Sequence, residues 1–479
     1  MTDRSDRRTA VPRWTRSDSI AVTIVTALAC SMRGLRLTSP PFIYSDELFY
    51  AREACNVVYR SPATCGIPLD AVSAHPPMGK WLISLGIRAF GWEPFGWRIA
   101  SLVAGTLTVA LLYLLARRVL GSSTAAAFAS GLLAIDFLHV VQSRIAMLDV
   151  FLTMFVVSAF TFVVIDRDTV AAQRRGAGEG AWHVARSRPW LVLAGAAAGG
   201  AVATKWVGFL ALLGSATVAL VWMAGSPGTS FARRLVHALR RNWLVLVVSF
   251  GAVPTLIYAA TYGPRVDGSV MAAPWARGSW VRGFAREQRD MLQFHRSSAE
   301  IRYLGSTNPF ASPAWSWPLV RRPMIYYSEP RTTAGRETVM AMGSPFVWWT
   351  ALACLATLAV GLVRRRTSDA AVVAVVGFAA MYGPLLLVSA ARSATFLYYM
   401  LPAVPFMCLG VAAAVVRLEA PWDRRAMLGI SVIAAAGFAF FYPVLTAQPL
   451  TDDSLAARQW FRDCSAPTAI APPTGWCWR

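Results

Sequence analysis

The stretch WRIASLVAGTLTVALLYLLA, from Trp97 to Ala116, decides the fold class of this chain. It has 20 residues, of which only Arg98 is charged, and a helix of this length crosses the hydrocarbon core of a bilayer. Comparable runs recur throughout the 479 residues, of which 56% are hydrophobic and 15% charged. Backbone groups inside a bilayer find no water, so an unbroken apolar run that spans it must form a helix. The sequence therefore predicts an all-α polytopic membrane protein.

The apolar runs also predict the number of transmembrane helices, which we put at about eleven. The count changes by one or two if residues 190–224 form one broken element. The sequence has no internal repeat, and no low-complexity linker separates the runs. The runs therefore predict one membrane domain over residues 19–446. The runs lie near 19–37, 97–116, 122–138, 147–166, 190–204, 206–224, 242–262, 346–363, 370–389, 394–416 and 427–446.

Arginine-rich connectors between the runs predict the orientation, because cytoplasmic loops carry an excess of basic residues. With residues 1–18 as a cytoplasmic tail, an odd number of helices places all of these connectors inside the cell. The same count places the tail 447–479 outside, together with two long loops at 38–96 and 263–345. The connectors are Arg117–Arg118, Arg167–Arg188, Arg233–Arg241, Arg364–Arg366 and Arg417–Arg425.

The formal net charge of +21 does not indicate nucleic-acid binding. The basic residues cluster in short segments between apolar runs, and no RNA- or DNA-binding motif occurs. Positive-inside topology and contact with anionic lipid explain the charge. Only two of the 46 basic residues are lysines, Lys80 and Lys205, so both positions merit attention.

The seven cysteines are too few for a disulfide scaffold. Cys55 and Cys65 share one loop, and Cys464 and Cys477 share the C-terminal tail, so two disulfides can form if those regions lie outside the cell. The sequence alone does not decide whether they do. The other three cysteines fall in apolar segments and are interpreted as packing residues; they are Cys30, Cys354 and Cys408.

Asp46 and Glu47, within IYSDELFY at Ile43–Tyr50, are adjacent carboxylates just beyond the first apolar run. They fit the start of a helix, because Ser45 can cap it and acids complement the positive end of the helix dipole. They also fit a general base, because deprotonating a hydroxyl nucleophile requires a carboxylate held close to it. The two interpretations are compatible, since a helix terminus is a rigid place for a base.

Arg98 lies near the start of the second apolar run, where an arginine requires a partner or a cavity. It can extend to the lipid headgroups, or it can clamp a phosphate with its planar guanidinium. Arg36, at the end of the first run, has the same two interpretations. Lys80, within HPPMGKW at His75–Trp81, belongs to the same membrane face and would add a point charge.

His139, Gln142, Arg144 and Asp149 bracket the short turn between the third and fourth runs. Asp149 lies inside an apolar run and needs a partner, for which Arg144 is the candidate. An ion pair that closes this helical hairpin is the simplest interpretation. His75 and His139 lack metal-ligand spacing, and no HExxH, cysteine pair or DxD occurs among these residues, so a tightly bound metal is unsupported. No glycine-rich phosphate loop or dinucleotide fingerprint occurs, which argues against a nucleotide-using enzyme.

Taken in series, the motifs of this chain resemble those of the bacterial protein O-mannosyltransferases, within the GT-C glycosyltransferases. Each motif is weak alone, but together they run in order over about residues 40–410. The matches are Asp46–Glu47, HPPMGKW at His75–Trp81, GWRIAS at Gly96–Ser101, SRIAMLDVFL at Ser143–Leu152, GGAVATKWVG at Gly199–Gly208, NPFASPAWSWP at Asn308–Pro318 and TFLYYMLPAVPF at Thr395–Phe406.

The resemblance implies a GT-C fold, a polyprenyl-phosphate mannose donor, and inverting transfer of mannose to Ser or Thr of unfolded exported polypeptides. It implies a multi-pass protein of the bacterial plasma membrane with an extracytoplasmic active site, and the protein-export machinery as a candidate partner. Asp46 matches the catalytic base, Glu47 its acidic neighbour, and Arg98 an arginine that contacts the donor phosphate region. No other cofactor is expected, although a divalent cation stays open. We expect the donor and substrate site to include also Lys80, His75, Arg144, Asp149 and Arg36.

Two features depart from the family pattern. The acidic pair follows Tyr44–Ser45, whereas an aromatic residue directly before the aspartate is commoner in the family. The second loop is too short for the β-trefoil domain of fungal and animal members, so acceptor selection by such a domain is absent.

Three other functions are compatible with parts of this sequence: a sibling GT-C enzyme, a transporter and a membrane scaffold. A sibling GT-C enzyme would move a lipid-linked sugar to a lipid or a cell-envelope glycan, and a mannosylated peptide product separates the two. A transporter would suit many helices and intramembrane charges, but the inverted repeats common in transporters are not found. A non-catalytic membrane scaffold is disfavoured by the constellation of charged residues from Asp46 to Asp149.

Overall fold

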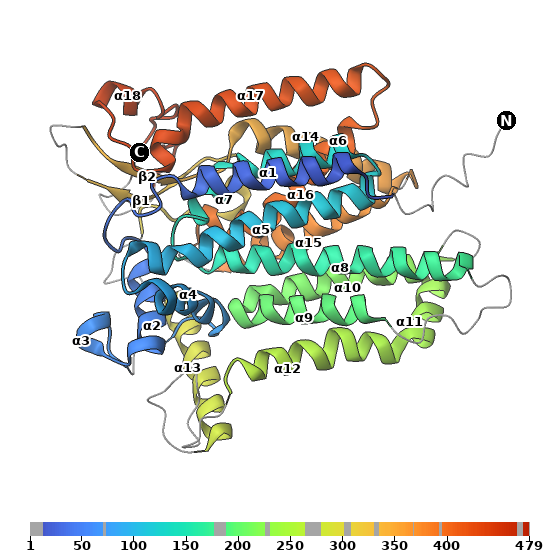
Figure 1. The fold of residues 1–479 in the computed structure, drawn as a ribbon, viewed down its shortest axis with the longest axis horizontal. Coiled ribbons are helices and arrows are strands. Elements are labelled where there is room, and N and C mark those ends of the chain that lie inside the picture. The colour runs from blue at the N-terminus through green and yellow to red at the C-terminus, as the bar shows by residue number, and fades with distance from the viewer. Residues whose placement is uncertain are drawn as a thin grey trace.

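The computed structural model describes residues 13–69, 73–176, 188–225, 230–263, 279–300, 308–329, 335–366, 368–391, 395–466 and 473–478. Long helices lie side by side with roughly parallel axes, and shorter elements gather at one end of this bundle (Figure 1). Each of the eleven predicted runs is helical. They correspond to α1 (Arg16–Gly34), α5 (Pro94–Leu120), α6 (Ser123–Ala134), α8 (Asp149–Gly176), α9 (Pro189–Thr204), α10 (Phe209–Met223), α11 (Phe231–Val247) joined by a π-helical turn to α12 (Val253–Ala260), α14 (Pro345–Val363), α15 (Asp369–Ala391), α16 (Val404–Val415) preceded by the 3-10 segment η5 (Leu397–Ala403), and α17 (Trp422–Leu445).

Eight helical segments among the described residues are long and apolar enough to cross a membrane. α6 and α9 are shorter apolar helices, and the 19-residue α1 is not one of the eight. The predicted class, an all-α polytopic membrane protein, is therefore confirmed. The number of eleven spans stays a prediction.

Local sequence explains where the helices begin and end. α5 begins at Pro94, whose fixed φ suits a first helical turn, and ends before Gly121, which adopts a left-handed φ of 72°. α1 begins with a capping box in which the Thr15 amide donates to the Asp18 carboxylate at 2.8 Å. This helix begins at Arg16, inside the predicted tail 1–18.

The interior of the bundle is built around α8, which packs against α5, α9 and α10. Most of the membrane-length window of α8 is buried, whereas α11 and α12 form a peripheral pair that is largely exposed. Small residues bring α9 close to α12: a Cβ added at Gly199 would lie 2.8 Å from the Pro254 Cα. Inside a bilayer the hydrophobic effect does not drive helices together, so they associate by van der Waals packing, which small residues permit.

The described parts of the two long predicted loops lie at the same end of the bundle. In Figure 1, α2, α3, α4, α13, α18 and a small hairpin lie together at the left, opposite the end where α1 begins. The hairpin, which the sequence did not predict, pairs antiparallel strands with Met324 opposite Ala341 and a bulge after Ile325. These elements are α2 (Glu47–Tyr59), α3 (Pro62–Cys65), α4 (Met78–Phe90), α13 (Trp280–Glu300), β1 (Met324–Ser328), β2 (Thr338–Ala341) and α18 (Asp452–Ala456). A further short helix, α7 (Phe137–Gln142), lies in the chain between α6 and α8.

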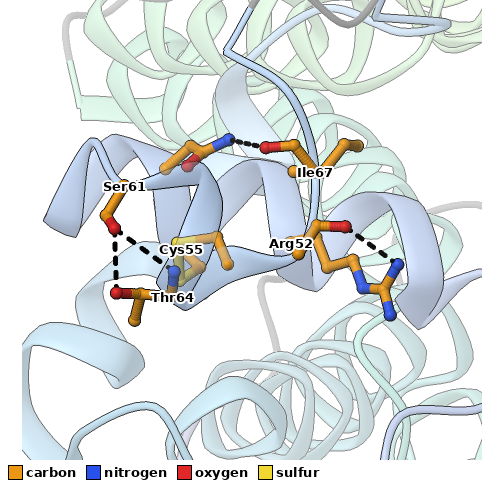
Figure 2. Close-up of a disulfide and its surroundings, with 8 residues drawn as sticks. Arg52, Cys55, Ser61, Thr64 and Ile67 are labelled. Atoms are coloured by element: carbon orange, nitrogen blue, oxygen red, sulfur yellow. Dashed lines mark hydrogen bonds between the residues drawn. A yellow bond between two sulfur atoms is a disulfide. The ribbon is translucent and has the colours of Figure 1, made fainter.

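Both cysteine pairs that could form disulfides do so. Cys55 and Cys65 tie α2 to α3, and Figure 2 shows the polar contacts around this link. Asn56 donates to the Ile67 carbonyl at 3.1 Å, and Arg52 donates to the Gly66 carbonyl at 3.1 Å. The loop that carries the first disulfide is therefore fixed on α2 by side-chain contacts as well.

The second disulfide, Cys464–Cys477, holds the C-terminal segment at the same end of the bundle. The cysteines predicted to be packing residues are all free thiols. Cys408 is buried as expected, whereas Cys30 is exposed on the surface of α1.

Candidate active site

The chain segment that leads from α1 to Asp46 is held by two buried arginines. The first is Arg144, which donates to the carbonyls of Arg33 at 2.6 Å, Leu35 at 2.5 Å and Arg36 at 2.8 Å. The Arg33 carbonyl belongs to the last turn of α1 and the other two to the residues just after it, where helical carbonyls lack internal partners and the dipole favours a cation. Arg144 thus fixes the position at which α1 ends.

The second is Arg98 on α5, which is fully buried. It donates to the carbonyls of Leu37 at 3.1 Å, Pro40 at 2.7 Å and Phe42 at 2.9 Å. Its Nε and Nη2 donate to the two carboxylate oxygens of Glu47 at 2.8 and 2.9 Å. All five N–H groups of this guanidinium therefore have acceptors within the protein.

Glu47, the first residue of α2, is the counter-ion of Arg98 and has no exposed surface. Its Oε1 also accepts from the Ala146 amide at 3.0 Å, and its Oε2 accepts from the Tyr44 amide at 3.4 Å. One carboxylate thus links α2, α5 and the turn before α8. Its contacts position these elements and leave it little capacity for a substrate.

Asp46, one residue earlier, has a different environment. It is the N-cap of α2, follows Ser45 with its left-handed φ of 51°, and is partly exposed. Its Oδ2 accepts from the Tyr398 hydroxyl at 3.4 Å, the one side-chain hydrogen bond to this carboxylate within the described residues. The two adjacent acids therefore have different environments: Glu47 is buried in an ion pair, and Asp46 is partly exposed.

Shielding from water raises the pKa of the Asp46 carboxyl above its ordinary value. The positive charge of Lys205 opposes this rise, and the negative charge of Asp149 adds to it. The hydrogen bond from Tyr398 lowers the pKa slightly. Asp46 is thus a carboxylate with open acceptor sites and a raised pKa, which suits a general base.

Lys205 and Asp149 form a buried ion pair beside Asp46. Lys205 follows α9, Asp149 begins α8, and their Nζ and Oδ2 atoms lie 2.7 Å apart. The prediction that Arg144 pairs with Asp149 is therefore wrong, because Arg144 is held by the end of α1 and the lysine comes from a distant helix. Within the described part of the chain, Asp149 accepts the only hydrogen bond from this ammonium, which has three N–H groups.

Tyrosines surround the Asp46–Lys205 site. The Lys205 Nζ lies 5.8 Å from the ring centre of Tyr398 and 5.7 Å from that of Tyr399. The ring of Tyr326, on β1, lies 6.0 Å from that of Tyr398. Gln142 at the end of α7 donates to the Tyr326 hydroxyl at 2.6 Å. The hairpin and α7 thus complete one wall of the site.

The other predicted residues lie at the margins. Lys80 donates to Glu53 at 2.8 Å, to the His75 carbonyl at 2.7 Å and to Ser73, so its three N–H groups have acceptors in the protein. The His75 ring packs near those of Tyr50 and His295, at 5.9 and 5.4 Å. These contacts join α2, the segment before α4, and α13.

Arg36 lies two residues after the end of α1, with a side chain 43% exposed. It donates to the Ala447 carbonyl at 2.9 Å and lies 3.9 Å from Glu337. Its guanidinium is accessible, unlike that of Arg98 or Arg144.

The structure brings together Asp46 and Asp149 from the predicted set, and it adds residues that the sequence interpretation did not place in the site. Lys205 carried a signal, since it is one of two lysines and lies in GGAVATKWVG. The additional residues are Lys205, Tyr398, Tyr326 and Gln142. In the described part of the chain, no three His, Cys, Asp or Glu residues gather in a metal-binding arrangement.

Two family models match the chain. The first, dolichyl-phosphate-mannose-protein mannosyltransferase, covers residues 88–266. The second, the C-terminal four-transmembrane region of protein O-mannosyltransferase, covers residues 280–464. Together they include α5, Lys205, the hairpin and Tyr398.

Curated relatives match over almost the whole chain. The polyprenol-phosphate-mannose–protein mannosyltransferase of Mycobacterium tuberculosis is 30% identical over 482 residues, covering 92% of this chain and 91% of the relative. Its counterpart in Mycolicibacterium smegmatis is 29% identical, with 91% of each chain covered. The enzyme of the same name from Corynebacterium glutamicum is 28% identical, with coverage of 87% and 85%.

Solved structures share the fold. A chain of the Saccharomyces cerevisiae Pmt1–Pmt2 protein O-mannosyltransferase complex bound to the sugar donor matches with a TM-score of 0.73 at 14% identity. The match covers 96% of this chain and 94% of that one. ArnT from Cupriavidus metallidurans bound to undecaprenyl phosphate matches with a TM-score of 0.53 at 20% identity, covering 88% and 64%. With its GT-C fold and its near full-length relatives, the chain belongs to the protein O-mannosyltransferase family.

Proposed function

We propose that this enzyme transfers mannose from polyprenyl-phosphate mannose to Ser or Thr hydroxyls of exported polypeptides. The observation that carries the proposal is the position of Lys205 beside Asp46, a carboxylate with acceptor sites that no protein donor fills in the described residues. Relatives that cover nearly the whole chain are named for this donor and for protein mannosylation, which supports the substrate assignment.

In the proposed reaction, the acceptor hydroxyl oxygen attacks the anomeric carbon of mannose. The new C–O bond forms as the bond from that carbon to the phosphate oxygen breaks, so the configuration at the carbon inverts. The hydroxyl proton goes to the Asp46 carboxylate, and the electron pair of the broken bond goes to the phosphate. Asp46 is suited to this step because its side chain has acceptor sites that no protein donor fills in the described residues.

Lys205 stabilises the leaving phosphate. A phosphate needs little protonation to leave, so a cation fixed near the developing charge can replace a general acid. Asp149 orients the ammonium through one N–H and leaves two for the phosphate. In this proposal Arg36, whose side chain is 43% exposed, is the candidate for a second cation that contacts the phosphate.

Arg98 and Glu47 act in this proposal as positioning residues. Their contacts hold the segment 37–47 against α5 and thereby fix the direction of Asp46. The arrangement differs from the paired acid and base of a glycosidase, since Glu47 and Asp149 are each held by a cation. One carboxylate, Asp46, therefore does the proton transfer.

The site belongs to the extracytoplasmic face in this proposal. Disulfides persist in oxidising compartments, and both of them lie at the end of the bundle that carries Asp46. The N-terminal helix begins at the opposite end, which then faces the cytoplasm of a bacterial plasma membrane. We also propose that the acceptor polypeptide is modified while it is still unfolded, during export and beside the export machinery.

A second function has one specific observation in its favour. ArnT shares the fold, and a 180-residue stretch is 36% identical to an undecaprenyl-phosphate aminoarabinose arabinosyl transferase of Pseudomonas savastanoi, covering 36% of this chain. In this alternative the chain would deliver a lipid-linked sugar to a lipid or a cell-envelope glycan. The nature of the labelled product separates this function from protein mannosylation.

The test uses membranes that contain the protein, radiolabelled polyprenyl-phosphate mannose, and a peptide rich in Ser, Thr, Pro and Ala. The matched control peptide has every Ser and Thr replaced by Ala. The proposal predicts label on the first peptide alone, its loss in Asp46→Ala, and its retention in Asp453→Ala, an exposed aspartate of α18. Label in a lipid or glycan fraction without peptide label would contradict the proposal. Parallel reactions with a chelator report whether a divalent cation takes part.

A further inference from the structure

A cavity of about 540 Å³ lies at the end of the bundle opposite the active site. It is lined by the far part of α8, the end of α10, the middle of α11 and the residue before α9. Asp149 and Asp166 are 17 residues apart along α8, which places the cavity about 26 Å from the Lys205 ion pair. This separation approaches the thickness of a bilayer core. The polar residues that line the cavity include Asp166, Arg167, Arg188, Trp222, His237 and Arg241.

Arginines from three segments line this cavity. Three arginines and one aspartate belong to the lining, and Asp168 and Asp369 pair with Arg167, so the excess positive charge of this region comes from α11, which carries four arginines and no acid. Arg188 pairs with Asp166, which orients its guanidinium at the floor. Arg167 lies 2.7 Å from both Asp168 and Asp369, and its guanidinium stacks 4.6 Å from the ring centre of Trp222. Both guanidinium groups are therefore held in fixed positions by carboxylate partners.

The remaining wall comes from α11, which has no acidic residue in its sequence. His237 and Arg241 are one turn apart on this helix, both line the cavity, and both are exposed. A ligand that enters here meets cations from α8, α9 and α11 together. A phosphate is the group that such a set recognises best.

The surface next to the cavity is apolar. Leu244, Val247 and Leu256 on α11 and α12 are 56–67% exposed, and Trp243 is 60% exposed. Exposed aliphatic residues along a membrane helix contact acyl chains, and a tryptophan near its end is typical of the headgroup level. The cavity thus lies where a charged headgroup layer meets hydrocarbon.

We propose that this cavity binds the headgroup of an anionic phospholipid, with its phosphate between α9 and α11 and its acyl chains along α11 and α12. Basic pockets between transmembrane helices recognise lipid phosphates in this way. The volume accommodates a phosphoglycerol headgroup, since ligand cavities of about 300–1,000 Å³ hold small molecules. This inference concerns lipid binding alone and does not depend on the proposed reaction.

The test is native mass spectrometry of the intact protein in a neutral detergent, titrated with dioleoylphosphatidylglycerol or with dioleoylphosphatidylcholine. Arg241→Ala removes one lining cation. Arg240→Ala is the matched control, because it removes the same charge from the neighbouring residue of α11, which does not line the cavity. We expect wild type to prefer the anionic lipid, Arg241→Ala to weaken that binding about fivefold, and Arg240→Ala to change it less than twofold.

Three outcomes would overturn the proposal. Equal binding of the two lipids would remove the role of the headgroup charge. Equal weakening in Arg240→Ala and Arg241→Ala would mean general attraction of anionic lipid to a basic helix. Displacement of the lipid by millimolar inorganic phosphate would identify a site for free anions. Unchanged melting of Arg241→Ala verifies that any loss of lipid does not follow from unfolding.

Discussion

The replacement Glu47→Gln tests whether the two adjacent acids have separate roles. Both side chains of the Glu47–Arg98 pair are fully buried. Glutamine keeps the shape of glutamate but removes the counter-charge of Arg98. Removing one partner of a buried ion pair costs about 3–5 kcal/mol, because the remaining charge is left uncompensated.

The hydrogen bonds show why glutamine cannot compensate. Each Glu47 oxygen accepts from one Arg98 N–H and one backbone amide, those of Ala146 and Tyr44. In glutamine one oxygen becomes an NH₂ group, which then faces two donors in either orientation. One buried Arg98 N–H and one backbone amide thus lose their acceptor, and this loss is part of the same destabilisation.

The assay compares thermal unfolding of wild type, Glu47→Gln and Asp46→Asn in one detergent. We expect a clearly lower midpoint for Glu47→Gln. Asp46→Asn should unfold at or slightly above the wild-type midpoint, since the raised pKa of Asp46 means that its charge is unfavourable in the fold at neutral pH. A wild-type midpoint for Glu47→Gln, or a large drop for Asp46→Asn alone, would refute the distinction between a positioning and a reacting carboxylate.

Three further predictions concern Lys205, Tyr398 and the first disulfide. Lys205→Met should lower kcat/KM for peptide mannosylation by about 10²–10³-fold, because a fixed cation near the leaving phosphate is lost; a change below threefold would contradict this. Asp46 acts deprotonated, so the rate falls as the pH falls through its pKa. Tyr398→Phe removes a hydrogen bond that lowers that pKa, so the acid limb of the pH–rate profile should move to higher pH while the plateau persists, and an unmoved limb would count against the contact. Replacing Cys55 and Cys65 by serine opens a loop of sequence separation 10 and should lower the free energy of unfolding by about 2.7 kcal/mol, whereas Cys354→Ser, which removes a free thiol, should leave it unchanged.

The membrane helices could be predicted because one physical requirement dominates them. An apolar run long enough to span a bilayer must satisfy its own backbone, so composition alone locates α5 within Pro94–Leu120 around the run Trp97–Ala116. The helix is longer than the run, since Pro94 and Gly121 set its ends through backbone conformation. The hairpin β1–β2 lacked such a signal, because its strands have only five and four residues, too few for a clear alternation of polar and apolar side chains.

The site was predictable in part. The sequence predicted Asp46 and Asp149 as site residues. It indicated Arg144 as the partner of Asp149 because a sequence shows only which residues are neighbours along the chain. The actual partner, Lys205, is 56 residues away and reaches Asp149 through the packing of α8 on α9.

The role of Arg98 illustrates a second limit of sequence patterns. Its charge in an apolar run indicated a partner or a cavity, and the two interpretations offered were the lipid headgroups and a phosphate. In the fold its partners are Glu47 and backbone carbonyls. The carbonyls of residues 37, 40 and 42 converge on it only because the chain turns back after α1. We therefore assign Arg98 to positioning and Lys205 to the leaving phosphate, and both assignments remain predictions for mutagenesis.

The most direct test of Asp46 as the base measures donor binding and transfer on the same Asp46→Asn protein. Binding of radiolabelled polyprenyl-phosphate mannose is measured on purified protein in detergent, and single-turnover transfer to a Ser/Thr peptide follows on the same preparation. We predict donor affinity within about threefold of wild type, because the asparagine keeps the shape of the site, and a transfer rate lower by about 10²–10⁴-fold, the contribution of a general base. Transfer at a near-wild-type rate would contradict the assignment, and so would a loss of rate that follows entirely from lost donor binding.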